Sequence, residues 1–149
     1  MTLQSWLKSG WLIEHKTSKE EITELLAIVN RDLSDCKIQN LSSDWKFNIA
    51  YNAALQAATI VLAACGYRAV REAHHYRIIQ SLSLTMKLPS SLVQQLDRFR
   101  KKRNVGGYER TGSISDQEVD EMIALSEHLA GVVKSWLETN HAKLLKNES

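Results

Sequence analysis

Apolar residues along most of the chain recur at the spacing of an α-helix rather than the alternation of a β-strand. In the segment 18–36 the apolar positions are Ile22, Leu25, Leu26, Val29 and Leu33. They fall on one face of a helix and predict that this face is buried. The same reasoning predicts further helices over 42–65, 70–86, 91–103 and 115–142. We therefore expect an all-α fold, an antiparallel up-and-down bundle of about five helices.

Local signals support the predicted helix ends. Ser18 with Glu21, Ser91 with Gln94, and Ser115 with Glu118 each form the pattern of a capping box. Gly66 suits the left-handed conformation that closes a helix, and Pro89 disfavours helical structure in the residue before it.

The segment 42–65 is apolar or small on nearly every side, because alanines surround its larger residues. Neighbouring helices can approach such a surface closely, so we expect this helix to be central. Tyr51 is predicted to lie in the core. Asn52 and Gln56 need hydrogen-bond partners, which either a pocket or a second subunit can supply.

Length and composition indicate one folded domain over 1–149, with an N-terminal segment 1–17 of undecided path and a frayed tail at 143–149. The chain is 44% hydrophobic and 24% charged, which is typical of globular proteins. Cys36 and Cys65 stand alone, so we expect reduced thiols.

The sequence predicts no targeting or membrane segment. Lys8, Gly10 and Glu14 interrupt the apolar residues of 1–16, which argues against a signal peptide. The apolar stretch 53–66 is too short to cross a bilayer as a helix. We expect a cytoplasmic protein without a membrane partner.

A basic run ends the predicted helix 91–103. The net charge is only +2, so any attraction to nucleic acid must come from a local patch of this kind. Positive charge is also favoured at a helix carboxyl end without any ligand. The candidate RNA-binding residues in this run are Arg98, Arg100, Lys101 and Lys102, followed by Arg103.

The residues Arg103, Asn104 and Tyr108 resemble the signature of the HEPN superfamily (higher eukaryotes and prokaryotes nucleotide-binding), with tyrosine in place of the usual histidine. The alanine-rich helix, followed by Gly66-Tyr67-Arg68 and then by His74-His75, is similar to the order found in these domains. The resemblance covers roughly 18–145.

The resemblance implies that Arg103, Asn104 and Tyr108 are the catalytic residues of a metal-independent ribonuclease. A tyrosine is a poor base at neutral pH, so Tyr108 leaves cleavage in doubt, and binding of RNA or a nucleotide is the alternative. Arg103 can donate two hydrogen bonds to a phosphate, and Tyr108 can stack on a base. Arg103 and Tyr108 are five residues apart and would point in different directions on a continuous helix. They can share one site only if Gly106 and Gly107 let the chain leave the helix and turn back.

His74, His75 and Arg71 are candidate nucleotide-pocket residues, and a plain surface histidine pair is the alternative. Adjacent helical residues diverge by ~100°, so His74 and His75 cannot easily share a metal ion. We expect no metal and no cofactor.

The resemblance also implies a homodimer of the toxin–antitoxin or defence type that brings two arginine motifs together. One alternative is a non-catalytic helical module that pairs with a small nucleotidyltransferase as its antitoxin. Another is an enzyme in which His74 or His75 assists Tyr108.

Overall fold

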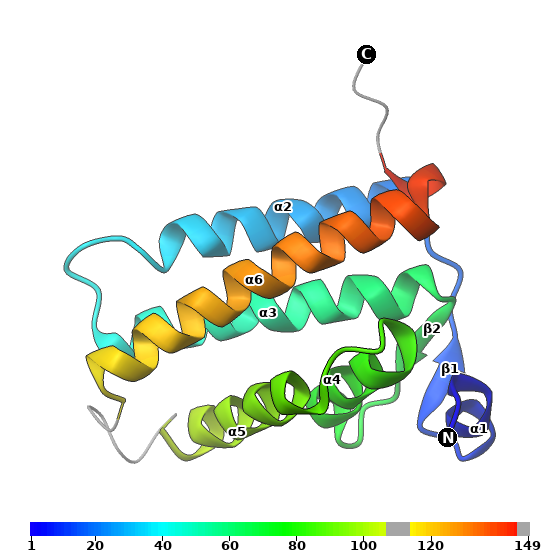
Figure 1. The fold of residues 1–149 in the computed structure, drawn as a ribbon, viewed down its shortest axis with the longest axis horizontal. Helices are drawn as coiled ribbons and strands as arrows, with labels where there is room; N and C mark the ends of the chain where they lie inside the picture. Colours follow the sequence, from blue (N-terminus) through cyan, green and yellow to red (C-terminus); the bar gives the residue numbers. More distant parts are fainter. Residues whose placement is uncertain (107–113, 146–149) are drawn as a thin grey trace.

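The computed structural model describes residues 1–106 and 114–145, with only the helical backbone for 104–106. Within these residues the chain forms six α-helices, one short 3₁₀ helix and one two-stranded sheet (Figure 1). The elements are α1 (Leu3–Lys8), β1 (Leu12–Glu14), α2 (Lys19–Asp35), α3 (Ser43–Ala64), β2 (Tyr67–Ala69), α4 (His74–Thr85), α5 (Ser90–Gly106), α6 (Asp116–Asn140) and η1 (Ala142–Leu144). The predicted all-α bundle is confirmed.

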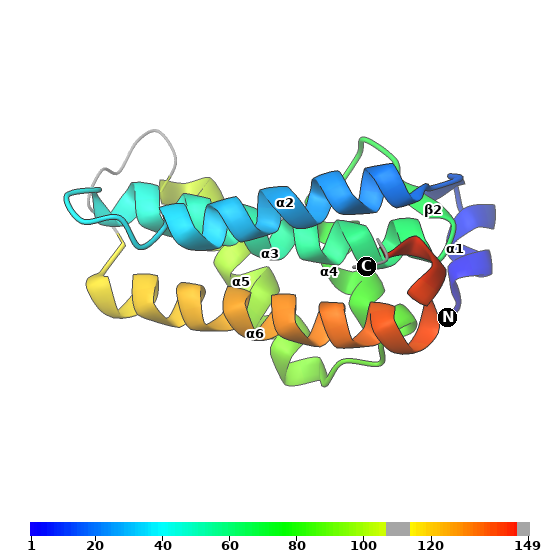
Figure 2. The ribbon, with the colours of Figure 1, turned by 90° about the horizontal axis from the view of Figure 1, so that it is seen from above.

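Helix α3 lies at the centre of the bundle. It packs against α2 and α6 on one side and against α4 and α5 on the other (Figures 1 and 2). Most of its residues are buried, including the alanines at positions 50, 53, 54, 57 and 58. A methyl side chain keeps the backbones of neighbouring helices close, so the small residues of α3 allow four helices to pack on it.

The length and composition of α3 would also suffice to cross a membrane, and within the described residues it is the one helix for which this holds. Burial inside the bundle covers 67% of its most apolar window. A helix that is apolar all round is expected at the centre of a helical core.

Two of the three predicted capping serines begin their helices as expected, but Ser91 does not, because α5 already begins at Ser90. The Ser18 hydroxyl accepts a hydrogen bond from the Glu21 backbone N–H, and the Ser115–Glu118 capping box forms in both directions. Glu21 does not complete its box, because its carboxylate binds His15 and Thr17 instead. Gly66 has the expected positive φ, +94°.

The small sheet was not predicted. β1 pairs antiparallel with β2, with Leu12 opposite Ala69 and Glu14 opposite Tyr67. The helix expected from Val70 therefore begins only at His74. The residue before it, Ala73, has a left-handed conformation (φ 53°), which a continuous helix cannot contain. Three-residue strands carry almost no periodic signal, and their partner lies far away in the sequence.

The N-terminal segment packs on the bundle through its tryptophans. The rings of Trp6 and Trp11 meet edge to face, with centroids 5.6 Å apart. The Arg77 guanidinium of α4 lies 3.5 Å from the centroid of the Trp11 ring, a close cation–π contact. This contact and the β1–β2 sheet decide the path of the N-terminal segment, which the sequence left open.

A polar contact joins α2 to α3 inside the bundle. Asn52 donates a hydrogen bond of 2.7 Å to the buried carboxylate of Asp32, which also accepts from Arg31. Gln56 in turn donates to Asn52 at 3.4 Å. Asn52 is thus satisfied within one chain by an aspartate from the facing helix, without needing a second subunit.

We expect Ala50→Leu to destabilise the protein by about 1–3 kcal/mol, because three added heavy atoms must fit where α3 touches α6. Ala50 is fully buried, and its carbonyl accepts a hydrogen bond of 2.6 Å from Ser126 of α6. Urea unfolding followed by circular dichroism measures the change. Ala27→Leu on the exposed face of α2 is the control. Equal stabilities of the two variants would contradict close packing at α3.

Candidate anion-binding site

Most basic residues of α5 are already paired with carboxylates. Arg100 Nε lies 2.8 Å from Asp97 Oδ1, and Lys101 Nζ lies 3.5 Å from Asp97 Oδ2. Lys102 Nζ lies 3.3 Å from Glu118 Oε2 at the start of α6. These ion pairs, together with the helix end, give the three residues a structural role. Contact with RNA stays a prediction for them and for the exposed Arg98.

Arg103 differs from the rest of the basic run. Its guanidinium carbon lies 5.2 Å from the centroid of the Tyr51 ring on α3, which is a cation–π contact. Its Nε is buried and has no hydrogen-bond partner within the described residues. Leaving a buried charged donor unsatisfied costs free energy, so an acceptor from a ligand would be favoured there.

His75 of α4 completes this cluster. Its Nδ1 lies 3.2 Å from the Tyr51 hydroxyl, so side chains from α3, α4 and α5 converge at one place. Burial lowers the pKa of His75 below its ordinary value of 6.5, and the positive charges of Arg103 and Arg100 lower it further. Burial raises the pKa of Tyr51 to about 12, although the same two arginines oppose this shift.

These pKa shifts decide the charge of both partners. At neutral pH the phenol of Tyr51 keeps its proton and the imidazole of His75 is neutral. The buried hydroxyl needs an acceptor, and among the described residues His75 Nδ1 lies within reach, so we assign the phenol as the donor. The proton of the imidazole then resides on Nε2, which becomes a donor. The site therefore combines a guanidinium with a neutral N–H donor, a combination suited to an anion.

An aromatic ring flanked by two guanidinium groups lies beside this cluster. The ring centroid of Tyr76 is 5.5 Å from the Arg77 guanidinium carbon and 5.4 Å from that of Arg100. Tyr76 is 36% exposed, so part of the ring is open to solvent. The sequence offered no signal that singled out Tyr76 or Arg77.

The predicted nucleotide-pocket residues also come together. Arg71, His74 and His75 line one open hollow of about 610 Å³ at the start of α4, together with Arg68 of β2. His75 thus belongs both to this hollow and to the Tyr51–Arg103 cluster. Whether a nucleotide binds there stays a prediction.

Two of the three predicted catalytic residues lie outside what the structure places. Tyr108 lies outside the described residues, as does the side chain of Asn104. The backbone of α5 continues to Gly106, one turn beyond the expected end at Arg103.

Tyr51 was predicted only as a core residue. A tyrosine rather than a phenylalanine among alanines was the signal that its hydroxyl needs a partner.

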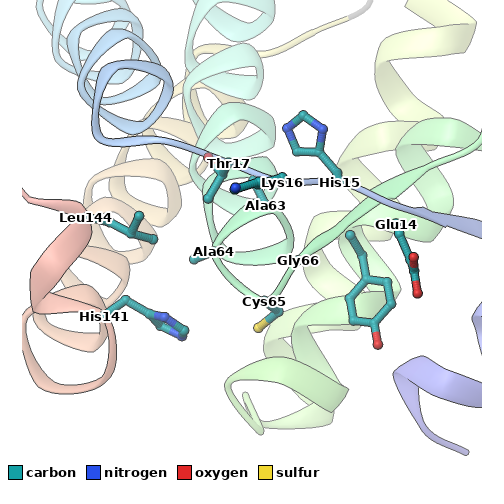
Figure 3. A pocket seen from close by; sticks show the side chains of 11 residues that line it. Glu14, His15, Lys16, Thr17, Ala63, Ala64, Cys65, Gly66, His141 and Leu144 are labelled. Atoms are coloured by element: carbon teal, nitrogen blue, oxygen red, sulfur yellow. The ribbon is translucent and has the colours of Figure 1, made fainter.

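The residues described supply no metal site and no activated thiol. No group of three or more His, Cys, Asp or Glu side chains within them is arranged to hold a metal ion. Figure 3 shows a wide hollow lined by Cys65, His141 and residues 14–17. Burial raises the pKa of the Cys65 thiol, which therefore stays protonated and is a poor nucleophile.

Comparisons of the chain with protein-family models, with curated proteins and with solved structures found no match. The HEPN resemblance therefore rests on the sequence motifs alone and stays a prediction. The same holds for the homodimer, for the nucleotidyltransferase partner and for the cytoplasmic location.

We expect the stability of the protein to fall as the pH drops through 6.5, the ordinary pKa of histidine, in part because of His75. Its pKa is lowered in the folded state, so the unfolded chain binds the proton first and is favoured as the pH falls through 6.5. In His75→Gln this contribution is absent. The free energy of unfolding of the wild type should therefore fall more steeply than that of the variant, measured by urea titration at each pH.

The control is His128→Gln, which replaces an exposed histidine of α6. Its pH dependence should parallel that of the wild type. Parallel curves for all three proteins would mean that His75 titrates normally, which would contradict its burial beside Arg103.

Proposed function

We propose that this chain is a HEPN-like domain that binds single-stranded RNA through the cluster of Arg103, Tyr51 and His75 and the neighbouring ring of Tyr76. The toxin–antitoxin or defence setting, in the cytoplasm and as a homodimer, belongs to the same proposal and comes from the resemblance. The observation that carries the proposal is the buried Nε of Arg103, which has no hydrogen-bond partner among the described residues and lies where three helices meet.

A phosphate group fits the chemistry of this cluster. Its oxygens accept hydrogen bonds only, and the cluster offers donors from the Arg103 guanidinium and from His75 Nε2. Arginine binds phosphate with two parallel hydrogen bonds, which are stronger than those between neutral groups. A phosphate would also offset the positive charge that Arg103 and Arg100 share around His75.

A base can stack beside the bound phosphate. Proteins that recognise single-stranded RNA stack unpaired bases on aromatic rings and on arginine planes. Tyr76, with the guanidinium groups of Arg77 and Arg100 close to its ring, provides such a surface one residue after His75. Bases inside a duplex are already stacked and cannot reach it, which favours a single strand.

Binding without cleavage is the form of the proposal that the chemistry supports. Cleavage by the 2′-hydroxyl needs a group that removes its proton. When the Tyr51 hydroxyl donates to His75 Nδ1, the imidazole proton lies on Nε2, and in this tautomer neither nitrogen is free to take the proton of the 2′-hydroxyl. Tyr51 itself, with a pKa of about 12, holds its proton at neutral pH.

The test is fluorescence anisotropy with a short labelled single-stranded RNA. We expect Arg103→Ala to weaken binding by about ten-fold or more, the amount that a charged hydrogen bond contributes. The salt dependence of binding should also become shallower by roughly 0.7 in the logarithmic slope, because one phosphate contact is lost. A denaturing gel run on the same samples should show intact RNA.

Lys134→Ala is the matched control, since it removes an exposed positive charge from the far part of α6. It should bind RNA like the wild type, and thermal melting should show that both variants are folded. RNA binding equal in Arg103→Ala and wild type, or absent in both, would contradict the proposal.

A further inference from the structure

A second cavity, deeper than the open hollow, lies between α2, α3 and α4. Its volume is about 310 Å³, and its lining has an apolar part and a polar part. The apolar part consists of Leu25, Ile28, Leu62, Ala63, Ala69 and Ile78, with Thr59 and Tyr67 beside them. This volume is at the lower end of the range of small-molecule pockets, ~300–1,000 Å³, so the cavity can enclose one planar ring system but not a larger ligand.

The lining of this cavity also carries charged groups. Glu21 and Glu24 of α2 supply hydrogen-bond acceptors, and Arg68 of β2 lies close enough to Glu21 to help lower the pKa of its carboxyl group. Hydrogen bonds from Thr17, at 2.7 Å, and from His15, at 2.8 Å, both go to Oε1 of Glu21. The bond from Thr17 is the main cause that lowers the pKa of Glu21, so its carboxylate is ionised at neutral pH. An ionised carboxylate only accepts, so a ligand here must present N–H or O–H donors.

The cavity adjoins the open hollow at the start of α4. The two share Arg68, Ala69 and His74 among their lining residues. The outer hollow adds Arg71, so its chemistry suits an anion. His74 Nδ1 lies 3.1 Å from the carbonyls of Ala69 and Val70 and donates to them, which fixes the imidazole at the boundary. In the neutral ring, Nε2 is then a further acceptor.

We propose that these adjoining spaces form a site for a small ligand in which a planar heteroaromatic ring with amino or N–H donors is joined to an anionic group. The ring lies in the inner cavity with its donors toward Glu21 and Glu24. The anionic group lies in the outer hollow on Arg68 and Arg71. Nucleoside monophosphates and pterin carboxylates both have this chemistry.

The inner cavity is separate from the proposed RNA-binding cluster, because it is lined by His15 and by residues of α2, α3, β2 and α4. The outer hollow shares only His75 with that cluster, and no residue of α5 lines either space within the described residues. The inference therefore does not rest on RNA binding, and each proposal can fail without the other.

The test is calorimetric titration of the full chain with adenosine monophosphate and with pterin-6-carboxylate. We expect at least one of them to bind, about ten-fold or more tightly than adenosine, which lacks the anionic group. Inorganic phosphate, which lacks the ring, should bind more weakly still.

Two variants examine the two parts of the site. Thr59→Phe fills the inner cavity and should abolish binding. Arg71→Ala removes an anion contact and should weaken binding by about ten-fold. Thr139→Phe on α6 is matched to the first, since Thr59 and Thr139 both bond the carbonyl four residues earlier, at 2.8 and 3.0 Å. Thr139 is exposed, so that variant should bind normally.

Thermal melting checks that each variant is folded. If Thr59→Phe is unfolded, the variant Ile28→Phe, which fills the same cavity from α2, is used in its place. Single-stranded RNA should bind to the cavity-filled protein as it does to the wild type. Failure of both probes to bind the wild type, or undiminished binding by a folded cavity-filled variant, overturns the inference.

Discussion

The close packing of helices on the alanine-rich surface of α3 is the constraint on which the rest of the structure depends. Methyl side chains along α3 let α2 and α6 approach from one side and α4 and α5 from the other. Because α4 and α5 are both held against α3, residues far apart in the sequence meet at Tyr51. A larger side chain at one of the buried alanines would move a helix and separate the members of this cluster.

Charge at the cluster follows from this packing. Burial alone would favour neutral groups, and Tyr51 and His75 are indeed neutral at neutral pH, with shifts in their pKa values that point away from the charged forms. Arg103 cannot lose its proton and therefore stays charged against the ring of Tyr51. The carboxylates of Asp97 and Glu118 neutralise the neighbouring basic residues of α5 but do not pair with Arg103 in the described part of the chain.

The start of α4 connects the Tyr51–Arg103 cluster with the outer hollow and the inner cavity. His75 contacts Tyr51, and His74 lies at the boundary between the outer hollow and the inner cavity. Tyr76 and Arg77 extend the series of stacked rings and guanidinium groups toward Trp11 in the N-terminal segment. His74 and His75 share the outer hollow, and Tyr76 and Arg77 contact each other, so these four consecutive residues join the two features. The N-terminal segment holds this turn of α4 in place.

The sequence by itself determined the five long helices, the capping residues Ser18 and Ser115 and the left-handed Gly66, because these depend on periodicity and on hydrogen bonds between residues a few positions apart. It also marked Arg103 and the histidine pair as candidates. It missed the short helix α1 and misplaced the starts of α4 and α5. Only the tertiary structure decided that Arg103 meets Tyr51 and His75, that Asn52 meets Asp32, and that β1 pairs with β2. These contacts join segments distant in the chain, and their geometry follows from how whole helices pack, which no local pattern encodes.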